Sequence, residues 1–164
     1  MHILALPKWY PGRHDPQMGD FIRKQMLATA GSVRMSVIFI AQLAGMARKE
    51  IQELDERDNL WELRCYYRPD RSRNKAVRKA VNFLRYRKAT MKAIARFLCE
   101  RDRPDLIHAH SLTRPVLMAR WYSGKWGIPY MVSEQSSVYL DGTWLAKSGS
   151  AKALDRLLLG NAAK

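Results

Sequence analysis

Residues 104–133, PDLIHAHSLTRPVLMARWYSGKWGIPYMVS, follow the pattern of a strand, a helix and a second strand. A proline ends the preceding helical pattern, and the short apolar segment at 105–110 favours a strand. The next residues predict a helix that ends near Gly124 or Gly127, and 128–133 predicts a further strand. Strands that alternate with helices of this length favour a parallel sheet covered on both faces, the doubly wound α/β architecture.

The same alternation is present upstream of this stretch. Asp20 is expected to be the N-cap of the first helix and Gly31 its stop, because these residue types favour those positions. The 41–60 segment is acidic and polar, and we expect a connection there. The predicted upstream elements are strands at 2–7, 33–40 and 61–68, and helices at 20–31 and 73–102.

The 164 residues suffice for one globular domain and are too few for two of ordinary size. Twenty-nine Lys and Arg against fifteen Asp and Glu give a formal charge of +14. Residues 61–103 carry 14 basic and 4 acidic side chains, and therefore most of this charge. The surplus favours a polyanionic neighbour, namely nucleic acid, an anionic membrane or a phosphorylated ligand, without choosing among them.

The cysteine content and the hydropathy pattern bear on the cellular setting. Cys65 and Cys99 are too few for a disulfide framework, and both lie in apolar segments where reduced cysteine packs as a small hydrophobe. A reducing cytoplasm is therefore the simplest setting. No stretch approaches the roughly 18 apolar residues that span a bilayer, so we expect any membrane contact to be peripheral.

The longest periodic stretch, at 73–102, combines an apolar stripe with a row of basic residues. The stripe, typical of the buried face of a helix, consists of Val77, Ala80, Leu84, Met91, Ile94 and Leu98. The row beside it, called the basic ridge below, consists of Arg71, Lys75, Arg78, Arg85, Lys92 and Arg96. We expect the basic ridge to face solvent. It is either an ordinary solvated surface or an anchor that attaches the protein to an anionic surface such as a membrane.

The loop from Trp9 to Gly19 joins the first strand to the first helix. The first amides of that helix have no partner within it, so the loop can hold a phosphate, with Gly19 allowing close approach. The loop contains neither the GxGxxG nor the P-loop pattern, so an ordinary turn is the alternative. Trp9 and Tyr10 can stack on a sugar ring or simply pack beside the strand.

Two histidines lie two residues apart in the segment DLIHAHS, so His108 and His110 face the same side of the predicted strand. A metal site would need a third ligand and usually a fourth, and the sequence has neither a Cys pair nor an HExxH motif. We therefore expect no metal. His110, at the carboxyl end of the strand, either contacts a ligand or is a satisfied structural residue.

A second polar cluster, Glu134, Gln135 and Ser136, follows the 128–133 strand. These side chains can bind a hydroxyl-rich ligand or cap the next turn. No GxSxG motif surrounds Ser111 or Ser136, so nucleophilic catalysis has little support.

Five segments, in this order and spacing, resemble the amino-terminal half of a glycosyltransferase family 4 enzyme. They are LPKWYP (6–11), Asp15, Gly19-Asp20-Phe21, PDLIHAHSLTRP (104–115) and GIPYMVSEQSSVYL (127–140). The resemblance implies one half of a GT-B fold, in which two Rossmann-like domains face each other. It also implies transfer of a sugar from a nucleotide-diphosphate sugar with retention of anomeric configuration, and no required metal or other cofactor.

The resemblance assigns roles to residues. Gly19 and Asp20 fall in the loop near the donor diphosphate, and His110 falls at the strand end that faces the interdomain cleft. Many relatives have histidine where this chain has Gln135, which can hydrogen-bond a sugar but cannot relay a proton. His110 and Gln135 are therefore the catalytic candidates. Binding of the acceptor or sugar is expected at Trp9, Tyr10, Ser111, Arg114, Glu134 and Ser136.

The resemblance also sets expectations for the whole chain. Residues 1–164 would be the acceptor-side domain only, ending before its last strand, after a loop and a partly apolar helix at 143–164. The chain would be inactive alone and would need a carboxyl-terminal donor-binding domain in cis or in trans.

Several members of the family dock on anionic membranes through basic helices, so the basic ridge is expected to face the inner surface of the cell membrane. The expected acceptor is a lipid-linked compound or saccharide of cell-envelope glycan synthesis. No specific nucleic acid partner is expected. The alternatives are a basic nucleic-acid-binding module, for which no RRM, KH or helix-turn-helix signature is present, and a stand-alone nucleotide-binding α/β protein.

Overall fold

The computed structural model describes residues 1–57, 59–134, 149, 152 and 153. Gln135 and Ser136 lie outside the described residues, as does almost all of the loop and helix predicted for 143–164. The strands of the described part are β1 His2–Pro7, β2 Arg34–Gln42, β3 Glu50–Arg57, β4 Leu60–Tyr67, β5 Leu106–His110 and β6 Tyr130–Ser133. Its helices are α1 Asp20–Ala30, α2 Lys75–Glu100 and α3 Arg114–Trp126.

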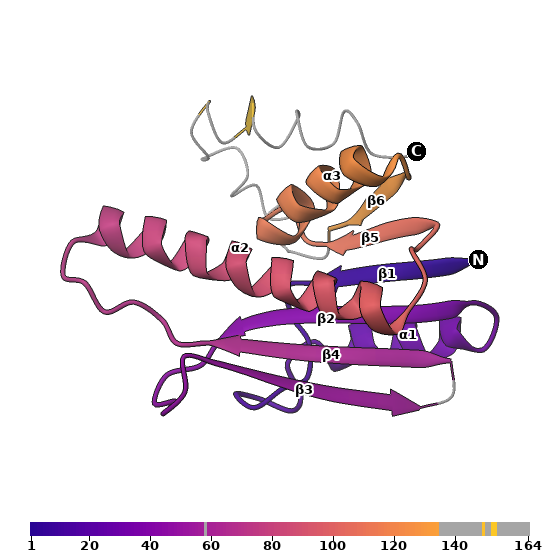
Figure 1. Cartoon of the computed structure of the whole chain (residues 1–164), viewed down its shortest axis with the longest axis horizontal. Coiled ribbons are helices and arrows are strands. Elements are labelled where there is room, and N and C mark those ends of the chain that lie inside the picture. The colour runs from indigo at the N-terminus through magenta and orange to yellow at the C-terminus, as the bar shows by residue number, and fades with distance from the viewer. Residues whose placement is uncertain (58, 135–148, 150–151, 154–164) are drawn as a thin grey trace.

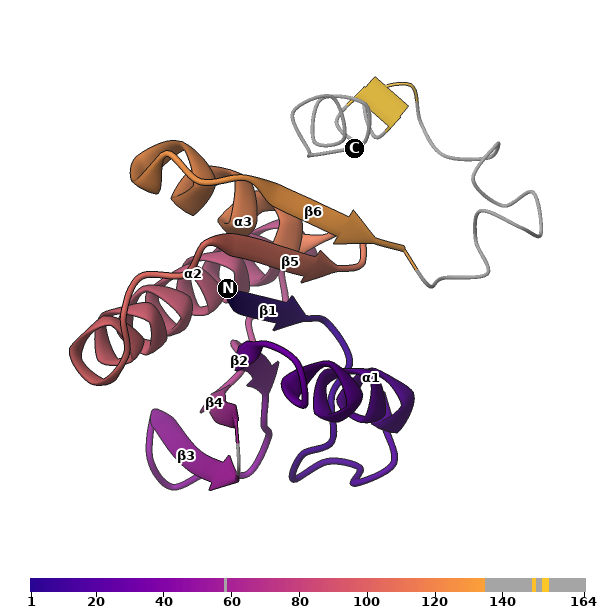
Figure 2. The ribbon, with the colours of Figure 1, turned by 90° about the vertical axis from the view of Figure 1, so that its right-hand side faces the viewer.

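The strands form one sheet in the order β3-β4-β2-β1-β5-β6. Neighbouring strands are parallel except for β3, which runs antiparallel to β4. Helices α2 and α3 cover one face of the sheet and α1 covers the other (Figures 1 and 2). This three-layer arrangement confirms the predicted doubly wound, Rossmann-like fold.

The strand order reverses direction between β1 and β5. From β1 the chain passes through α1 to β2 on one side, whereas from β4 it passes through α2 to β5 on the other side of β1. Doubly wound sheets bind ligands outside the carboxyl ends of the strands near such a reversal. These ends are the arrowheads of β1, β2, β4 and β5 at the left of Figure 1.

The 41–60 segment contains β3, a strand that the sequence analysis took for part of a connection. It pairs with β4 from Glu50 opposite Tyr67 to Arg57 opposite Leu60, and it forms the edge of the sheet. None of its residues is buried. Because an edge strand with no fully buried side chain needs no strict apolar alternation, its sequence lacks the usual strand signal.

Gly19, rather than Asp20, is the N-cap of α1. Gly19 has a left-handed backbone with φ 70°, which favours glycine. Asp20 is the first helical residue, and its carboxylate pairs with Lys24 at 2.8 Å. At the other end of the chain, α3 stops at Gly127, the second of the two glycines predicted to end it.

The buried face of α2 differs from the predicted apolar stripe. Of the large stripe residues only Ile94 is buried, while Val77, Leu84, Met91 and Leu98 are 41–58% exposed. The residues that α2 buries are Asn82, Tyr86, Ala89, Thr90, Ala93, Ile94 and Phe97. Its two small alanines allow a close approach to the sheet, and the aromatic rings fill the space on either side of them.

The two cysteines lie in different environments. Cys65 on β4 is buried as predicted, and burial raises the pKa of its thiol to about 12. Cys99 is exposed, because it lies on the outer side of α2, next to Leu98. The prediction that both pack as small hydrophobes is therefore wrong for Cys99.

Candidate functional site

A pocket of about 420 Å³ lies at the carboxyl ends of β1, β2 and β4. Pro7 and Lys8 line it from the end of β1, Gln42 from the end of β2 and Tyr67 from the end of β4. Parallel neighbours end at the same sheet edge, so residues from three separate segments meet there. The remaining lining residues are His14, Met18, Phe39, Ile40, Ala41, Tyr86, Thr113, Arg114 and Pro115.

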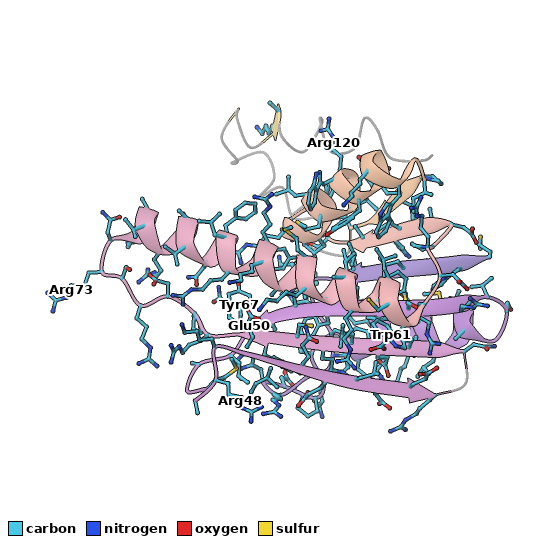
Figure 3. The ribbon with its side chains drawn as sticks, in the orientation of Figure 1. Arg48, Glu50, Trp61, Tyr67, Arg73 and Arg120 are labelled. Carbon is cyan, nitrogen blue, oxygen red and sulfur yellow. The ribbon has the colours of Figure 1, made fainter. Side chains whose placement is uncertain are left out.

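A second hollow, of about 470 Å³, lies at the opposite edge of the sheet. Tyr67 and Trp61, labelled in Figure 3, mark the two ends of β4 and so the two hollows. The cationic residues of the second hollow are paired: Arg34 lies 3.0 Å from Asp102, and Arg101 pairs with an acidic residue of β3. The pocket at the carboxyl ends is the better candidate, since ligands of this fold bind there.

Arg114, the first residue of α3, lies against an aromatic wall of the pocket. Its Nη1 donates to the Tyr67 hydroxyl at 3.0 Å, and its guanidinium carbon lies 5.5 Å from the centre of the Tyr86 ring. Gln42 also donates to the Tyr67 hydroxyl, at 3.0 Å. No carboxylate of the described residues forms a salt bridge with Arg114. The contacts of Arg114 therefore fix the guanidinium without neutralising its charge.

His108 and His110 lie side by side on β5, with ring centres 4.0 Å apart. Nε2 of His108 is 2.8 Å from Oγ of Ser133. His110 is 1% exposed, and neither of its ring nitrogens has a hydrogen-bond partner among the described residues. Burial lowers the pKa of His108 to about 4, and burial together with neighbouring His108 lowers the pKa of His110 to about 3.

Both imidazoles are consequently neutral at pH 7, and His110 retains one unused donor and one unused acceptor. The pairing of β1 with β5 places His110 opposite Pro7, a residue that lines the pocket. His110 does not itself line the pocket, but it neighbours Pro7 in the sheet, and its ring nitrogens have no hydrogen-bond partner among the described residues.

The loop between β5 and α3 is held by bonds to the end of β6. Ser111 has a left-handed backbone with φ 82°, the single non-glycine case in the described part of the chain. Its amide donates to the Ser133 carbonyl at 2.8 Å, and Glu134 accepts from the Leu112 amide at 2.6 Å. Ser111 and Glu134, both predicted to bind ligand, therefore shape the loop that presents Arg114.

Glu62 on β4 is a buried carboxylate that the sequence analysis missed. It accepts a hydrogen bond from the Tyr10 hydroxyl, and Arg23 of α1 donates to both of its oxygens at 2.8 and 2.9 Å. Arg64 reaches Glu62 at 3.1 Å and also donates to the carbonyl of Pro11 at 3.0 Å. Glu62 thus connects the loop after β1, helix α1 and strand β4.

The charge state of Glu62 follows from these contacts. Burial raises the pKa of Glu62, but hydrogen bonds from Arg23 and Tyr10 and the charge of Arg64 outweigh burial, so the pKa lies below its usual value. The carboxylate is therefore ionised at neutral pH. A signal was present in the sequence, because Glu62 and Arg64 alternate with apolar residues in WELRCYY.

Gly19 is the most tightly packed glycine of the loop after β1. A Cβ at this position would lie 2.5 Å from the Trp9 carbonyl carbon and 2.8 Å from the Tyr10 nitrogen. The Gly19 carbonyl accepts the first helical bonds of α1, from Ile22 and Arg23. Neither Gly19 nor Asp20 lines the pocket.

The two aromatic residues predicted to bind sugar lie outside the pocket. Tyr10 is completely buried, with its ring 5.9 Å from that of Phe39. Its ring packs in the core beneath α1 and offers no face to a sugar, because its hydroxyl is drawn inward by Glu62. Trp9 is half-buried and carries the Lys8 ammonium 4.3 Å above its ring.

The basic ridge is divided between open and paired residues. Arg71, Lys75 and Arg78 are exposed at or before the start of α2, where Figure 3 shows neighbouring Arg73 extending away from the fold. Further along α2 the residues have acidic partners: Arg85 pairs with Asp70 at 3.5 Å, Lys92 with Glu50, and Arg96 with Glu100 at 2.7 Å. The first part of the ridge therefore carries the less compensated charge.

Within the described ranges, no group of three or more His, Cys, Asp or Glu side chains is arranged to hold a metal ion. None of the helices described combines the length and apolar character needed to cross a bilayer.

Tyr86, Tyr67 and Lys8 were not predicted to belong to the site. Tyr86 was overlooked because the larger aliphatic residues of α2 were taken for its buried face. No local pattern distinguishes Tyr67 from its neighbour Tyr66, whose side chain lies on the opposite face of the sheet. Only the meeting of β4, α2 and α3 makes these residues a site.

A doubly wound domain with a polar, aromatic-walled pocket at the carboxyl ends of its strands is a ligand-binding domain of the Rossmann-like class. The sequence model of the glycosyl transferase 4-like domain matches residues 21–164, and the chain belongs to that family. It is a glycosyltransferase domain, which confirms the resemblance drawn from its motifs. A search of curated proteins found no match.

Proposed function

We propose that the chain is the acceptor-side domain of a retaining glycosyltransferase. The enzyme transfers a hexose from a nucleotide-diphosphate sugar to a lipid-linked or saccharide acceptor in cell-envelope glycan synthesis, without a metal or other cofactor. The observation that carries the proposal is the pocket at the ends of β1, β2 and β4, where Tyr67, Tyr86 and Arg114 meet. Aromatic walls with a few fixed polar groups suit a sugar ring.

In this proposal the chain orients the acceptor, and a carboxyl-terminal domain, in cis or in trans, holds the donor. Orientation accelerates transfer because it removes the entropic cost of bringing two substrates together. His110 accepts a hydrogen bond from an acceptor hydroxyl and fixes its direction. Its pKa of about 3 makes it a weak base, so its role is orientation more than proton removal.

The loop after β1 has a positioning role in the same proposal. Gly19 lies at the start of α1, where backbone amides and the helix dipole favour a donor phosphate. Glu62 keeps this loop in place through Tyr10 and Arg23. Gln135 contacts the donor sugar in the proposal, by the resemblance alone.

The test is a transfer assay with the chain joined to, or mixed with, its carboxyl-terminal domain. A panel of nucleotide sugars is offered with a membrane-lipid extract as acceptor, and release of nucleoside diphosphate is measured. We expect acceptor-dependent release from the combined domains and none from the chain alone. In the combined enzyme, His110→Gln and Arg114→Gln should each lower kcat/KM by about tenfold or more.

Two results would overturn the proposal. One is the absence of transfer by the combined domains across the donor panel. The other is micromolar affinity of the isolated chain for a nucleotide in isothermal titration, which would favour a stand-alone nucleotide-binding protein.

The proposal also places the enzyme at the cytoplasmic surface of an anionic membrane, bound through α2. Four exposed residues spaced by seven, called the apolar seam below, run along α2 beside the basic ridge: Val77, Leu84, Met91 and Leu98. Apolar side chains can insert among lipid tails, and each nearby Lys or Arg contributes about 1 kcal/mol on an anionic surface. An exposed apolar seam next to uncompensated cations is difficult to explain as a merely solvated face.

Vesicle sedimentation tests this part of the proposal. We expect the chain to bind vesicles that contain anionic lipid, and the double variant Leu84→Gln, Met91→Gln to bind several-fold more weakly. Leu54→Gln is the matched control, because Leu54 is 40% exposed but lies on β3. Equal weakening by the control, or no binding by the unmodified chain, would contradict membrane docking through α2.

A further inference from the structure

Among the described residues, the lining of the pocket at the carboxyl ends carries positive charge and no negative charge. Two of its described lining residues, Lys8 and Arg114, are cationic, and none is Asp or Glu. The hollow at the opposite edge differs, since three carboxylates accompany its two arginines. Two hollows on the helices, one lined by Arg87, Lys88 and Lys92 and the other by Arg120 and Lys125, also lack carboxylates among their described lining residues, so the charge imbalance alone does not single out the pocket.

Most of the hydrogen-bond donors of Arg114 have no acceptor among the described residues. Of its five N–H groups, one donates to a described residue, the hydroxyl of Tyr67. Its other described contact is the face of the Tyr86 ring. This cation–π contact holds the guanidinium in place, but the uncharged ring does not neutralise it. The remaining N–H groups match two oxygens of a tetrahedral or planar anion.

A buried hydroxyl on the same wall also lacks a partner within the described part of the chain. Thr113 lines the pocket at the N-cap position of α3, yet its side chain makes no cap bond. Its Oγ1 is buried and has no hydrogen-bond partner among the described residues. A buried polar group without a partner is costly, and α3 has no acidic residue in its first turn to compensate its dipole. An anion at this position would accept a hydrogen bond from the Thr113 hydroxyl and would also compensate the dipole of α3.

We propose that this pocket binds a phosphate ester carried by the acceptor. Arg114 pairs with the phosphate, and Lys8 does so when its ammonium turns from the Trp9 ring toward the pocket. Thr113 donates its hydroxyl, and Tyr67 and Tyr86 adjoin the sugar. That the phosphate belongs to an acceptor rests on the proposed function, whereas the recognition of phosphate rests on the contacts above. The inference narrows the acceptor to phosphorylated sugars and sugar-phosphate lipids, and excludes neutral saccharides.

The test uses the full chain and NMR titration with a hexose phosphate, the unphosphorylated hexose and a nucleoside diphosphate. We expect the hexose phosphate to shift the amide signals around Thr113 and the end of β1, and the hexose alone to have little effect. Arg114→Gln and Lys8→Gln should each weaken binding of the hexose phosphate by about tenfold, because each removes a charge-assisted contact. Arg114→Lys should restore part of the affinity.

The matched control is Lys79→Gln, which removes the same charge from the exposed side of α2, outside the pocket. Equal weakening by Lys79→Gln would show non-specific attraction and overturn the inference, as would equal affinity for the hexose. A nucleoside diphosphate that displaces the hexose phosphate from the same signals would assign the site to the donor, and so contradict an acceptor phosphate. The transfer assay is separate, so phosphate binding without transfer would refute the proposed function and leave the phosphate site standing.

Discussion

Three glycines allow backbone strain and steric clash to be separated. Gly19→Ala introduces both, since its φ is 70° and a Cβ would press on the backbone of Trp9. We expect a loss of about 2–4 kcal/mol in the free energy of unfolding. Gly45→Ala, with φ 78° and open space, should lose about 1 kcal/mol from strain alone. Gly124→Ala, within α3 and unobstructed, should gain up to about 1 kcal/mol.

Urea unfolding of the three variants checks this order. A Gly19→Ala variant as stable as Gly45→Ala would show that the loop after β1 moves freely, and that Gly19 is not required for its shape.

The carboxylate of Glu62 is the second residue whose loss should be severe. Glu62→Gln leaves Arg23 and Arg64 without their counter-charge, and we expect a loss of roughly 2–4 kcal/mol of unfolding free energy. Glu53→Gln is the matched control, because Glu53 pairs with Arg13 near the surface, where such pairs contribute about 0–1 kcal/mol. Similar losses in the two variants, measured by urea unfolding, would argue against a special role of the buried network.

The histidine pair gives the unfolding free energy a specific pH dependence. Unfolded histidines titrate near pH 6.5, whereas His108 and His110 titrate at about 4 and 3 when folded. Between these values the unfolded chain binds more protons, so stability falls as pH is lowered from about 6.5, by up to about 1.4 kcal/mol per pH unit for each histidine. The pKa of Glu62 is also lowered, but its contribution is lost only below about pH 4.5.

Urea unfolding between pH 7.5 and 5 isolates the contribution of the buried histidines, because Glu62 stays ionised in that range. His2 contributes to the same slope, since burial lowers its pKa as well, so the His110 part is read from the difference between His110→Gln and the unmodified chain. The slope should be smaller in His110→Gln than in the unmodified chain. An unchanged slope would mean that His110 is protonated in the folded state or that it is exposed.

At the scale of elements, α2 has two apolar faces with different roles. Leu84→Ala should change the unfolding free energy by less than about 0.5 kcal/mol, because Leu84 is 58% exposed. Phe97→Ala should lose about 3–5 kcal/mol, because Phe97 is completely buried against the sheet. Thermal or urea unfolding distinguishes the two variants. A large loss of unfolding free energy in Leu84→Ala would show that the stripe predicted from the sequence is the buried face of α2.

Periodicity alone cannot choose between these two faces. The apolar seam has the larger aliphatic side chains, and sequence analysis therefore favours it. The sheet instead receives Ala89 and Ala93 between two aromatic residues, because small residues let the helix approach closely. For a similar reason β3 escaped prediction, since an edge strand is held by backbone pairing with β4 and its side chains carry no apolar pattern.

At the scale of the whole molecule, the charge of +14 predicts binding to any polyanion at low salt. Near 0.15 M salt the Debye length is about 8 Å, and purely electrostatic binding weakens. We expect binding to anionic vesicles to weaken less with salt than binding to nucleic acid of similar charge density. The reason is that the apolar seam adds a hydrophobic contribution to vesicle binding, which salt does not screen. A salt series with both partners checks this, and sequence-selective nucleic-acid binding that survives salt would favour the alternative function.

The candidate site was only partly predictable from the sequence. The sequence predicted site residues at the carboxyl end of β5, in the loop after β1 and at Arg114, because strand ends and loops leave local signals, and of these Arg114 lines the pocket. Tyr10 was placed in the site although it is buried under α1, since a local pattern does not reveal which way an aromatic side chain points. Lys8, Tyr67 and Tyr86 were missed, because they become neighbours only when β1, β4 and α2 pack together.

The sequence by itself determined the alternation of strands and helices, the basic character and the family. These are local properties, set by apolar periodicity, glycine and proline positions, charge counts and motifs within single segments. Tertiary structure alone decided which face of α2 is buried, that β3 closes one edge, and that Glu62 connects three elements. It also decided that Arg114 and Thr113 line a pocket whose described lining includes no acidic residue. These properties depend on contacts between residues far apart in the chain, whose energies no local pattern contains.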